Sequence, residues 1–484
     1  MCSLKDFPEL GENSTIIDNN MSSSFMVKRV KPQTINYPNI IIQLQVDNAP
    51  ENLFLPTTRP TILQNIISKY MNEGFWSAWD DLEKYIDGNQ NSVSKIIHPI
   101  KFLMLMLSPR MNLKGSENKL SGVSRTKLWS SSIIRSMAWH PQTFKLAVVS
   151  SYDTIFVYNQ KGIEARIKKK SQRSILSLAW RPLSTGTIAV GCEKGIFIWN
   201  IEFSVLHARP SVNNVSEFVR DDHRYITGLS WNKMGDLLIS TAVSSKTMYV
   251  WSYPLGNSVP LRRIGTGTLN FVIWSPDNTK VFSCTTNESF RIWNTDKWVS
   301  DKWSVSTKSR VQCACWSPCS LILLFATDSC PAVNAIDFRK SDVFNEPLNY
   351  KKVAWPVIDL KSERINDKNI GGIPSDMCWD QNGKRLAITF KDNNSVLIFT
   401  TSINTTVVDC IPLCIIQGYL DEEPSVVAFQ PLYEAGSLLT IGWSNGNIEY
   451  VPFMYNSKLK CDPELTETSF FHLKQENNMS TRVH

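Results

Sequence analysis

Histidine is the residue type in this sequence best suited to acid–base catalysis or metal binding near neutral pH. Six histidines are present, but no two are four residues apart, as in the zinc ligands of a helical H-E-x-x-H motif. They are His98, His140, His207, His223, His472 and His484. The sequence also lacks the G-x-S-x-G, Walker and G-x-G-x-x-G patterns, which position nucleophiles or phosphates. It therefore predicts no catalytic residue, no cofactor and no small-molecule substrate.

Cysteine is the second residue type that could carry chemistry, and the sequence has eleven. The densest group, Cys313, Cys315 and Cys319, contains no C-x-x-C pair and has no histidine nearby as a fourth zinc ligand. The segment Met1–Asp6 lacks the apolar stretch of a secretory signal, so we expect reduced thiols. Cys313 and Cys315 share one face of a predicted strand. We therefore expect structural cysteines and no metal site.

His140 points to the elements that organise the chain, because it follows an aromatic residue at the end of a short apolar strand. This phrase occurs seven times, and the residue after the aromatic varies, which makes His140 one variant of a tolerant turn position. The seven aromatics are Trp139, Trp180, Trp231, Trp274, Trp316, Trp379 and Phe429. Their numbers differ by 41, 51, 43, 42, 63 and 50. The shorter intervals match the period of a WD-type propeller blade, roughly 40–45 residues.

A second aromatic follows 19 to 22 residues after each of the first six. These residues are Tyr158, Trp199, Trp251, Trp293, Phe338 and Phe399, and in the last repeat Ile448 or Tyr450 is the candidate. Turn residues and an apolar strand lie between the two aromatics, which predicts small antiparallel sheets. Such sheets bury both faces when they pack radially, with large side chains filling the wedges between them. The sequence thus predicts an all-β fold, a seven-bladed WD-type β-propeller, with these aromatics as structural blade residues.

The chain divides into three predicted parts. Residues 1–120 form an N-terminal extension, irregular at first and then partly helical, because Ile62, Ile66, Ile67, Tyr70 and the residues that follow fit a helical stripe. Residues 121–455 form the propeller. Residues 456–484, mostly polar, form a flexible C-terminal tail.

Ring closure requires the two ends of the propeller to share a blade. We expect Ser124–Trp129 to supply the outer strand of the last blade, and the alternating stretch Tyr37–Val46 to be able to add to a sheet edge. The long intervals between repeats predict extra loops at Leu206–His223 and Arg339–Ile370. These loops are candidates for partner contacts or inert surface loops.

Charge gives little support for nucleic-acid binding. The net charge is +7, and the densest basic cluster contains Arg166, Lys168, Lys169, Lys170 and Arg173. This cluster fits either a solvated turn between strands or a basic site, which would be a nuclear localisation signal or a patch for an acidic partner. The longest strongly apolar run, Phe102–Leu107, is far shorter than the about 20 residues of a membrane-spanning helix. Any membrane contact is therefore expected to be indirect or peripheral.

The repeats resemble WD repeats, with two departures. Asn, Ser and Asn follow Trp199, Trp251 and Trp293, where the WD dipeptide has Asp. The Gly-His pair that usually opens such repeats is also missing. We therefore expect the Asp–His–Ser/Thr–Trp hydrogen-bond network of WD blades to be largely lacking, with aromatic packing in its place.

Several segments, in order along the chain, resemble the aladin family of WD-repeat nucleoporins. They are Met1–Leu4, Ala138–Pro141, Ser177–Ser184, Phe290–Trp293 with Trp298, Cys315–Pro318, Leu413–Gly418 and Ser437–Ser444. The resemblance runs from residue 1 to about residue 455.

The resemblance implies a non-enzymatic scaffold or adaptor of the nuclear pore complex. Its partners would be other nucleoporins, above all a transmembrane nucleoporin that anchors it at the nuclear envelope. It would support nucleocytoplasmic transport and protein transport, and it could also act at the spindle poles in mitosis. The alternatives are a cytosolic WD-repeat adaptor, such as a substrate receptor of a ubiquitin ligase, and a propeller hydrolase. No residue is assigned to partner binding.

Overall fold

The computed structural model of this chain describes most of the predicted propeller and little of its flanks. The described residues are 2–3, 40–41, 124, 126, 129, 131–203, 214–262, 267–305, 309–339, 354–365, 368–391, 393–403, 408–418, 422–434 and 436–454. The predicted helices after residue 60 and the predicted flexible tail lie outside these residues. Within them, no helix has the length and apolar character needed to cross a membrane.

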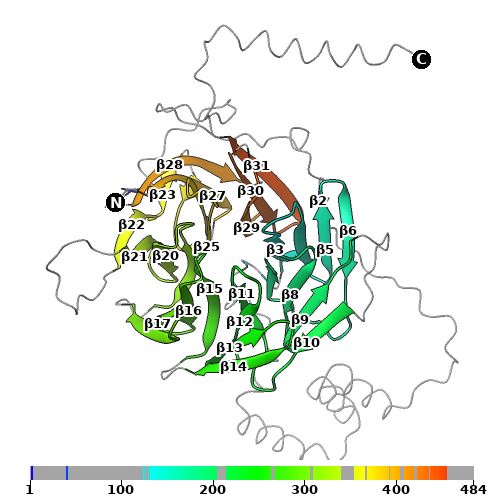
Figure 1. The fold of residues 1–484 in the computed structure, drawn as a ribbon. Helices are drawn as coiled ribbons and strands as arrows, with labels where there is room; N and C mark the ends of the chain where they lie inside the picture. Colours follow the sequence, from blue (N-terminus) through cyan, green and yellow to red (C-terminus); the bar gives the residue numbers. More distant parts are fainter. Residues whose placement is uncertain are drawn as a thin grey trace, which may run out of the picture.

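The strands form seven sheets around a central axis, with the first strand of each sheet nearest the centre (Figure 1). Blades 1 and 2 contain β3 (Ile134–Trp139), β4 (Leu146–Ser150), β5 (Ile155–Asn159), β6 (Gly162–Ile167), β7 (Ser177–Trp180), β8 (Thr187–Gly191), β9 (Ile196–Asn200) and β10 (Val215–Phe218). Blades 3 and 4 contain β11 (Ile226–Trp231), β12 (Leu237–Ala242), β13 (Thr247–Ser252), β14 (Asn257–Arg262), β15 (Leu269–Trp274), β16 (Lys280–Thr285), β17 (Ser289–Asn294) and β18 (Val299–Ser304).

The second half of the ring contains three further sheets and a small hairpin. Blade 5 is built from β19 (Val311–Trp316), β20 (Ile322–Thr327), β21 (Ala332–Asp337), β22 (Trp355–Asp359) and β1 (Cys2–Ser3). Blade 6 contains β25 (Pro374–Trp379), β26 (Arg385–Phe390), β27 (Ser395–Ile403) and β28 (Val408–Gln417), and β23 (Glu363–Ile365) with β24 (Lys368–Ile370) forms the hairpin before it. Blade 7 contains β29 (Pro424–Gln430), β30 (Gly436–Trp443), β31 (Asn447–Met454) and β2 (Ile40–Ile41). The predicted seven-bladed β-propeller is confirmed.

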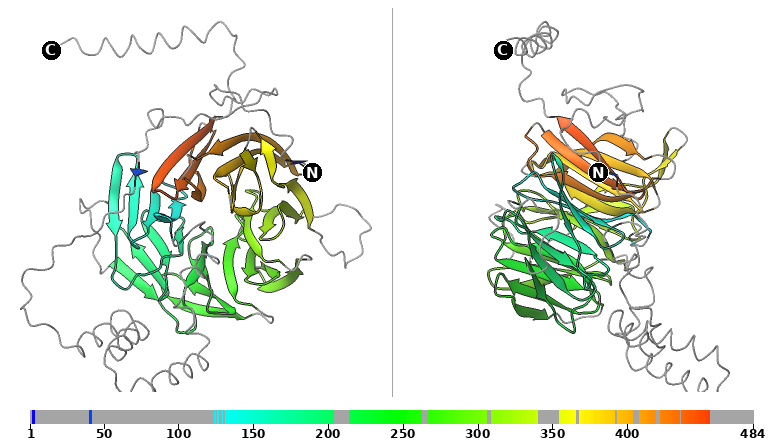
Figure 2. Two further views of the ribbon diagram at one scale, coloured as in Figure 1. Left: turned by 180° about the vertical axis from the view of Figure 1, so that it is seen from behind. Right: turned by 90° about the vertical axis from the view of Figure 1, so that its right-hand side faces the viewer.

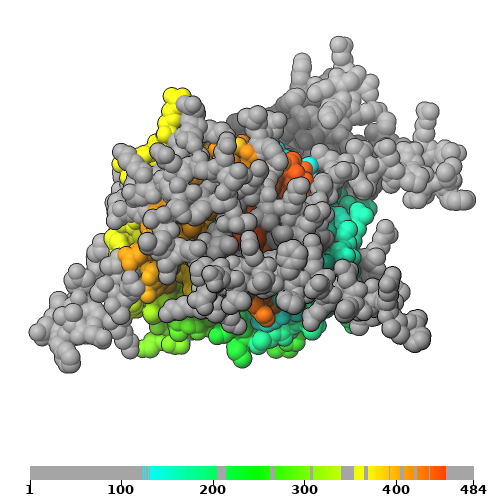
Figure 3. Space-filling view, turned by 90° about the horizontal axis from the view of Figure 1, so that it is seen from above, coloured from blue at the N-terminus to red at the C-terminus, as the bar shows by residue number. Residues whose placement is uncertain are grey.

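Two short strands from the N-terminal extension complete blades that lie far along the chain. Strand β1 runs parallel to β22, and β2 pairs antiparallel with β31, Ile40 opposite Ile448. The stretch Tyr37–Val46, which contains β2, therefore does add to a sheet edge. In the view from above, the orange-red residues of blade 7 lie between the yellow and orange residues of β22 to β28 and the teal residues of blade 1 (Figure 3).

The prediction that Ser124–Trp129 supplies the outer strand of blade 7 is wrong. Trp129 is buried elsewhere, against Leu176 and Tyr225, which precede the inner strands of blades 2 and 3. Its indole N–H donates to the carbonyl of Ile175 at 2.9 Å, and the Arg135 guanidinium lies 4.2 Å from its ring centroid. These contacts hold Trp129 near the centre of the ring, away from the outer edge of blade 7.

The two predicted loops are partly strand. Strand β10 lies within Leu206–His223, and β22 and the β23–β24 hairpin lie within Arg339–Ile370. Each interval holds the fourth strand of a blade, β10 or β22, as the shorter intervals do. Only part of each therefore stays available as a loop.

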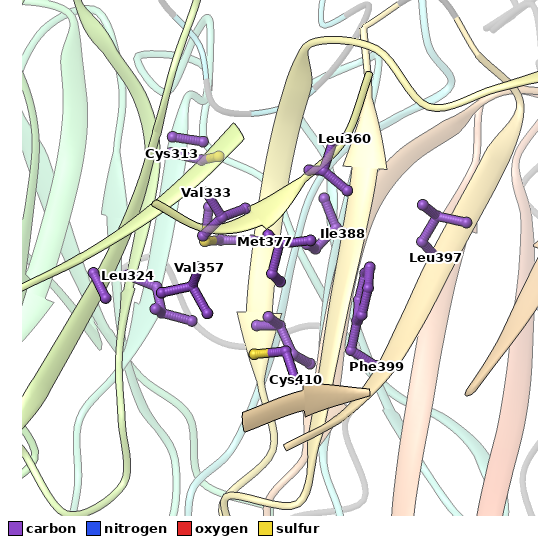
Figure 4. Close-up of a cluster of buried hydrophobic side chains, with 14 of the residues drawn as sticks. Cys313, Leu324, Val333, Val357, Leu360, Met377, Ile388, Leu397, Phe399 and Cys410 are labelled. Atoms are coloured by element: carbon purple, nitrogen blue, oxygen red, sulfur yellow. The ribbon is translucent and has the colours of Figure 1, made fainter. Parts of the chain in front are cut away.

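The core consists of seven apolar clusters, one between each pair of neighbouring blades. Figure 4 shows the cluster between blades 5 and 6, where Cys313 and Val333 face Met377 and Phe399. The last cluster joins blade 7 to blade 1 and closes the ring. Each blade therefore buries both faces against neighbours, as the repeat pattern predicts.

The inner-strand aromatics share one register. Each pairs with an apolar residue of the second strand: Trp139 with Leu146, and Trp180 with Ile188. The same holds for Trp231, Trp274, Trp316, Trp379 and Phe429. On its other side, the apolar residue pairs with the third-strand aromatic in five blades, and these aromatics are Tyr158, Trp199, Trp251, Trp293 and Phe399.

Phe338 departs from this register. Ile336 holds the third-strand position in blade 5, where it pairs with Leu323, and Phe338 follows the strand. The assignment of Phe338 as the third-strand aromatic is therefore wrong. Its ring packs 5.4 Å from that of Trp316, between centroids. In blade 7 the position belongs to Val451, and neither Ile448 nor Tyr450 occupies it.

Candidate protein-docking faces

The ring is a thick disc with two broad faces, which Figure 2 shows edge-on in its right-hand view. Because the strands of a blade alternate in direction, the turns between its first and second strands all lie on one side. We call this side the turn face. The segments that lead from one blade to the next lie on the opposite side, which we call the linker face.

On the turn face, the residue after the inner-strand aromatic closes the turn with its side chain in several blades. Asn232 Oδ1 accepts from the backbone N–H of Asp236 and of Leu237, both at 3.1 Å. Ser317 Oγ accepts from Ile322 N–H at 3.0 Å. Asp380 Oδ1 does the same for two backbone N–H groups, at 2.7 and 2.8 Å. Asn232, Ser317 and Asp380 share a side-chain acceptor that replaces missing backbone partners, whereas Arg181 of blade 2 has none.

His140 plays this part in blade 1. Its Nδ1 accepts from the backbone N–H of Gln142 and Thr143, both at 3.0 Å, so Nε2 carries the proton and donates to the Ser184 carbonyl at 2.7 Å. Burial lowers the pKa of His140, which keeps the ring neutral. The side chain is completely buried, and its two nitrogens are used by the backbone. His140 is therefore a turn residue, as the repeat comparison predicts.

The turns are also hydrogen-bonded to their neighbours. The Leu183 N–H of blade 2 donates to Gln142 Oε1 of blade 1 at 3.1 Å, and Arg181 Nε donates to the Gly235 carbonyl of blade 3 at 2.6 Å. Two more bonds, of 2.8 and 2.9 Å, continue the series to blades 4 and 5. These bonds fix the relative positions of the turns, so the turn face is a preorganised surface.

Apolar side chains stand at the tips of these turns. Phe144, Leu183, Met234 and Leu321, from blades 1, 2, 3 and 5, are 40%, 64%, 61% and 38% exposed. Leu183 has φ 56°, a left-handed conformation that costs a residue with a side chain roughly 1–2 kcal/mol. Leu183 is mostly exposed, so burial within this chain does not offset the cost of its strained conformation. Preorganised apolar tips of this kind lose little conformational entropy when a partner covers them.

The linker face holds ion pairs, although it also exposes Tyr152 and Val219. Arg135 pairs with Asp153 at 3.2 Å in blade 1, and Arg310 pairs with Asp328 at 3.0 Å in blade 5. The second pair borders a recess of about 500 Å³ between blades 4 and 5. The recess is lined by Thr286, Asn287, Glu288, Ser309, Arg310, Asp328 and Ser329.

Two blades keep part of the WD hydrogen-bond network: in blade 4 the Trp293 indole N–H donates to Ser283 Oγ at 2.9 Å, and blade 3 adds a histidine. In blade 3, His223 Nε2 lies 2.7 Å from Ser240 Oγ, and the Trp251 indole N–H donates to the same oxygen at 2.8 Å. Burial lowers the pKa of His223 to about 4. The expectation that the network is largely lacking is therefore wrong for blade 3. Asp222 stands where Gly is usual before this histidine, which hid the motif.

The inner-strand tryptophans also connect the blades. The indole N–H of Trp180 donates to the Ala138 carbonyl at 3.0 Å, and that of Trp231 to the Ala179 carbonyl at 3.2 Å. In each case the acceptor is the residue before the aromatic of the preceding blade, and Trp316 makes the equivalent bond at 3.4 Å. These aromatics are thus buried blade residues whose polar atoms face neighbouring blades.

The nine cysteines from Cys192 to Cys414 are thiols that form no disulfide. Burial raises the pKa of Cys192 to about 11 and that of Cys414 to about 12, so both remain protonated near neutral pH. Cys313 packs in the cluster between blades 5 and 6, with Cys315 against it, whereas Cys319 is exposed. No group of three or more His, Cys, Asp or Glu residues that could hold a metal occurs among the residues with described positions.

Seven radial blades, with a His–Ser–Trp chain in one of them, define a WD-type β-propeller. The family model described as the Aladin seven-bladed propeller matches residues 115–454, well over half of the chain. The chain therefore belongs to the aladin propeller family. It is similar to the curated protein Aladin from Arabidopsis thaliana, with 23% identity over 386 residues, 73% of this chain and 83% of that protein.

Proposed function

We propose that the chain is a non-enzymatic scaffold nucleoporin of the nuclear pore complex. The observation that carries this proposal is its membership of the aladin propeller family. A propeller whose turns are hydrogen-bonded to one another is suited to this role, because it holds contact residues in place at little entropic cost. In this role the protein supports nucleocytoplasmic transport, with a second role at the mitotic spindle.

The turn face is the surface that we assign to the anchor, a transmembrane nucleoporin. Four exposed apolar tips lie on its turns between first and second strands, and Leu183 keeps a strained conformation while it is 64% exposed. Burying such tips against an apolar segment of the anchor removes them from water and gains free energy in proportion to the area covered. The anchor then holds the protein at the nuclear envelope.

The location of the fluorescently tagged full-length chain in cells tests the proposal. We expect a punctate signal around the nucleus; a diffuse cytosolic signal would reject the nucleoporin and favour the cytosolic adaptor.

The matched test of the turn face replaces its four apolar tips with serine. The changes are Phe144→Ser, Leu183→Ser, Met234→Ser and Leu321→Ser. The control replaces four similarly exposed apolar residues on the outer strands, with exposures of 61% to 62%. The control changes are Ile163→Ser, Val259→Ser, Val299→Ser and Ile411→Ser. We expect the first variant to fold but leave the nuclear rim, and the control to stay; if both stay, the anchor binds elsewhere.

A further inference from the structure

Five cations gather on the linker face, where the connection between blades 1 and 2 meets the outer part of blade 2. Lys168, Lys170 and Arg173 are exposed in this connection, and Lys169 lies between them. Lys194 joins them from the turn between β8 and β9, because the Glu193 N–H donates to the Arg173 carbonyl at 3.0 Å. We call these five residues the basic patch.

A single carboxylate lies within the basic patch. Glu217 Oε1 is 2.7 Å from Lys169 Nζ, and its Oε2 is 3.0 Å from Lys194 Nζ. The hydrogen bond from Lys169, followed by the effects of Lys194, lowers the pKa of Glu217, which therefore stays ionised. Lys168, Lys170 and Arg173 form no ion pair with the residues that the structure describes. Three exposed positive charges are left over at one place.

Two other carboxylates nearby are already in use. Asp153 accepts from the backbone N–H of Ser174 and of Ile175, both at 3.0 Å, and also pairs with Arg135. Glu193 Oε1 accepts from the Tyr225 hydroxyl at 3.2 Å. Neither Asp153 nor Glu193 is therefore left to neutralise the positive charges of Lys168, Lys170 and Arg173.

The backbone of the basic patch is fixed. Ile167 and Ile175, at its two ends, are buried. Between them, Gln172 is buried too, its N–H donates to the Lys169 carbonyl at 3.0 Å, and its side-chain oxygen accepts from the Trp199 indole at 2.9 Å. A linear nuclear localisation signal is bound in an extended conformation. The connection between blades 1 and 2 can adopt that conformation only if the two blades separate. The structure thus favours a folded patch over a linear signal.

We propose that the basic patch binds an acidic segment of a partner protein. Three rigidly placed cations can be met at once by closely spaced carboxylates, and desolvation is small because all the charges stay at the surface. On the blade 3 side, exposed Asp221 and Asp222 follow β10 beside exposed Arg220 and Arg224, so this connection adds no net positive charge. The positive surplus is therefore limited to a short stretch, which suits a short acidic peptide better than a long phosphate backbone. This contact lies on the face opposite the proposed anchor site, so the two do not depend on each other.

The experiment uses the full chain and a fluorescein-labelled decaglutamate peptide, with decaglutamine as the neutral probe, and measures anisotropy at low and high salt. The patch variant carries Lys168→Glu, Lys170→Glu and Arg173→Glu. A matched variant with the same change in net charge alters three exposed lysines of the turn face. These changes are Lys233→Glu, Lys297→Glu and Lys384→Glu.

We expect the patch variant to bind decaglutamate about tenfold more weakly and the matched variant less than about twofold more weakly. Added salt should weaken wild-type binding, because the contacts are exposed ion pairs. The neutral triple change to glutamine should give an intermediate loss, and melting curves should show all variants folded. Equal losses in the two charge-reversed variants, or no binding by the wild type, would overturn the proposal. Tighter binding of a single-stranded 20-nucleotide DNA, lost in the patch variant, would assign the patch to nucleic acid instead.

Discussion

The two faces of the disc are stabilised by different kinds of interaction. The turns of the turn face are held by hydrogen bonds from backbone N–H groups to side chains such as His140 and Asn232, and apolar tips are exposed to water. The linker face is held by ion pairs such as Arg135–Asp153 and Arg310–Asp328, and it leaves charge in water. The two faces thus differ in the interactions that hold their backbone segments in place.

The largest expected effect comes from breaking the packing that both faces share. Trp180→Ala should reduce the free energy of unfolding by roughly 3–5 kcal/mol, because it empties part of the cluster between blades 1 and 2 and removes the bond to the Ala138 carbonyl. Urea denaturation measures the loss. Phe144→Ala, at an exposed tip, is the control and should cost less than about 1 kcal/mol. A similar cost for both would mean that the tips are part of the core.

Acid should act on the linker side of blade 3 through His223. The pKa of its folded form, about 4, lies below the value of 6.5 for the free group. The unfolded chain therefore binds the proton first, and stability is complete above pH 6.5 and falls as the pH drops towards 4. His223→Gln should reduce the stability difference between pH 7 and pH 4.5 by roughly 2–3 kcal/mol.

His140→Gln is the comparison on the turn face. Burial lowers the pKa of His140 as well, so its neutral form is the stable one and its protonation destabilises the fold in the same direction. Urea unfolding of the two single variants at both pH values measures how much of the acid-induced loss of stability comes from each face. An unchanged pH dependence in His223→Gln would contradict the burial of a neutral ring.

Relief of strain should distinguish the turn face from an ordinary surface. Leu183→Asn should raise the free energy of unfolding by about 0.5–1 kcal/mol, because asparagine tolerates the left-handed conformation better and no buried contact is lost. Met234→Asn, at a tip without positive φ, should give no gain. A loss of stability in Leu183→Asn would show that the leucine is held by contacts within the chain.

The smallest effect should come from an ion pair of the linker face. Arg310→Gln should cost about 0.2–1 kcal/mol at low salt and less at high salt, since its pair with Asp328 is partly exposed. Asn278→Ala, which removes the 2.8 Å acceptor for the Lys233 N–H on the turn face, should have a cost that salt does not change. Thermal melting at two salt concentrations makes the comparison, and equal salt dependence would contradict it.

Sequence periodicity was enough to predict the ring, because the aromatic residues mark one strand position in each blade. The prediction failed where the third-strand position is not aromatic, at Ile336 in blade 5 and Val451 in blade 7. In blade 5, Phe338 was assigned instead, although its distance in sequence from Trp316 is two or three residues longer than in the other blades. Ring closure by Ile40–Ile41 rather than Ser124–Trp129 could not be settled from the sequence. Both segments have strand-forming residues, and only the burial of Trp129 between the inner strands decides.

The candidate site was harder to predict than the fold. That the residue after each aromatic varies could be read from the sequence, but not that His140, Asn232 and Asp380 serve the same backbone groups. The basic patch was visible as a charge cluster. Its rigid backbone and the contribution of Lys194 from another turn come from tertiary contacts, which a linear pattern does not contain.

Pairing of β2 with β31 has a consequence for the order of events during synthesis. Ile40 and Ile41 leave the ribosome about 400 residues ahead of Asn447 and Ile448, the residues they pair with. At the usual speed of translation, this delay is on the order of 20–80 s. Throughout that time the outer strand of the last blade has no partner, and blade 1 displays an apolar side that is later covered by blade 7. The nascent chain is therefore expected to be a chaperone substrate until its final blade is complete.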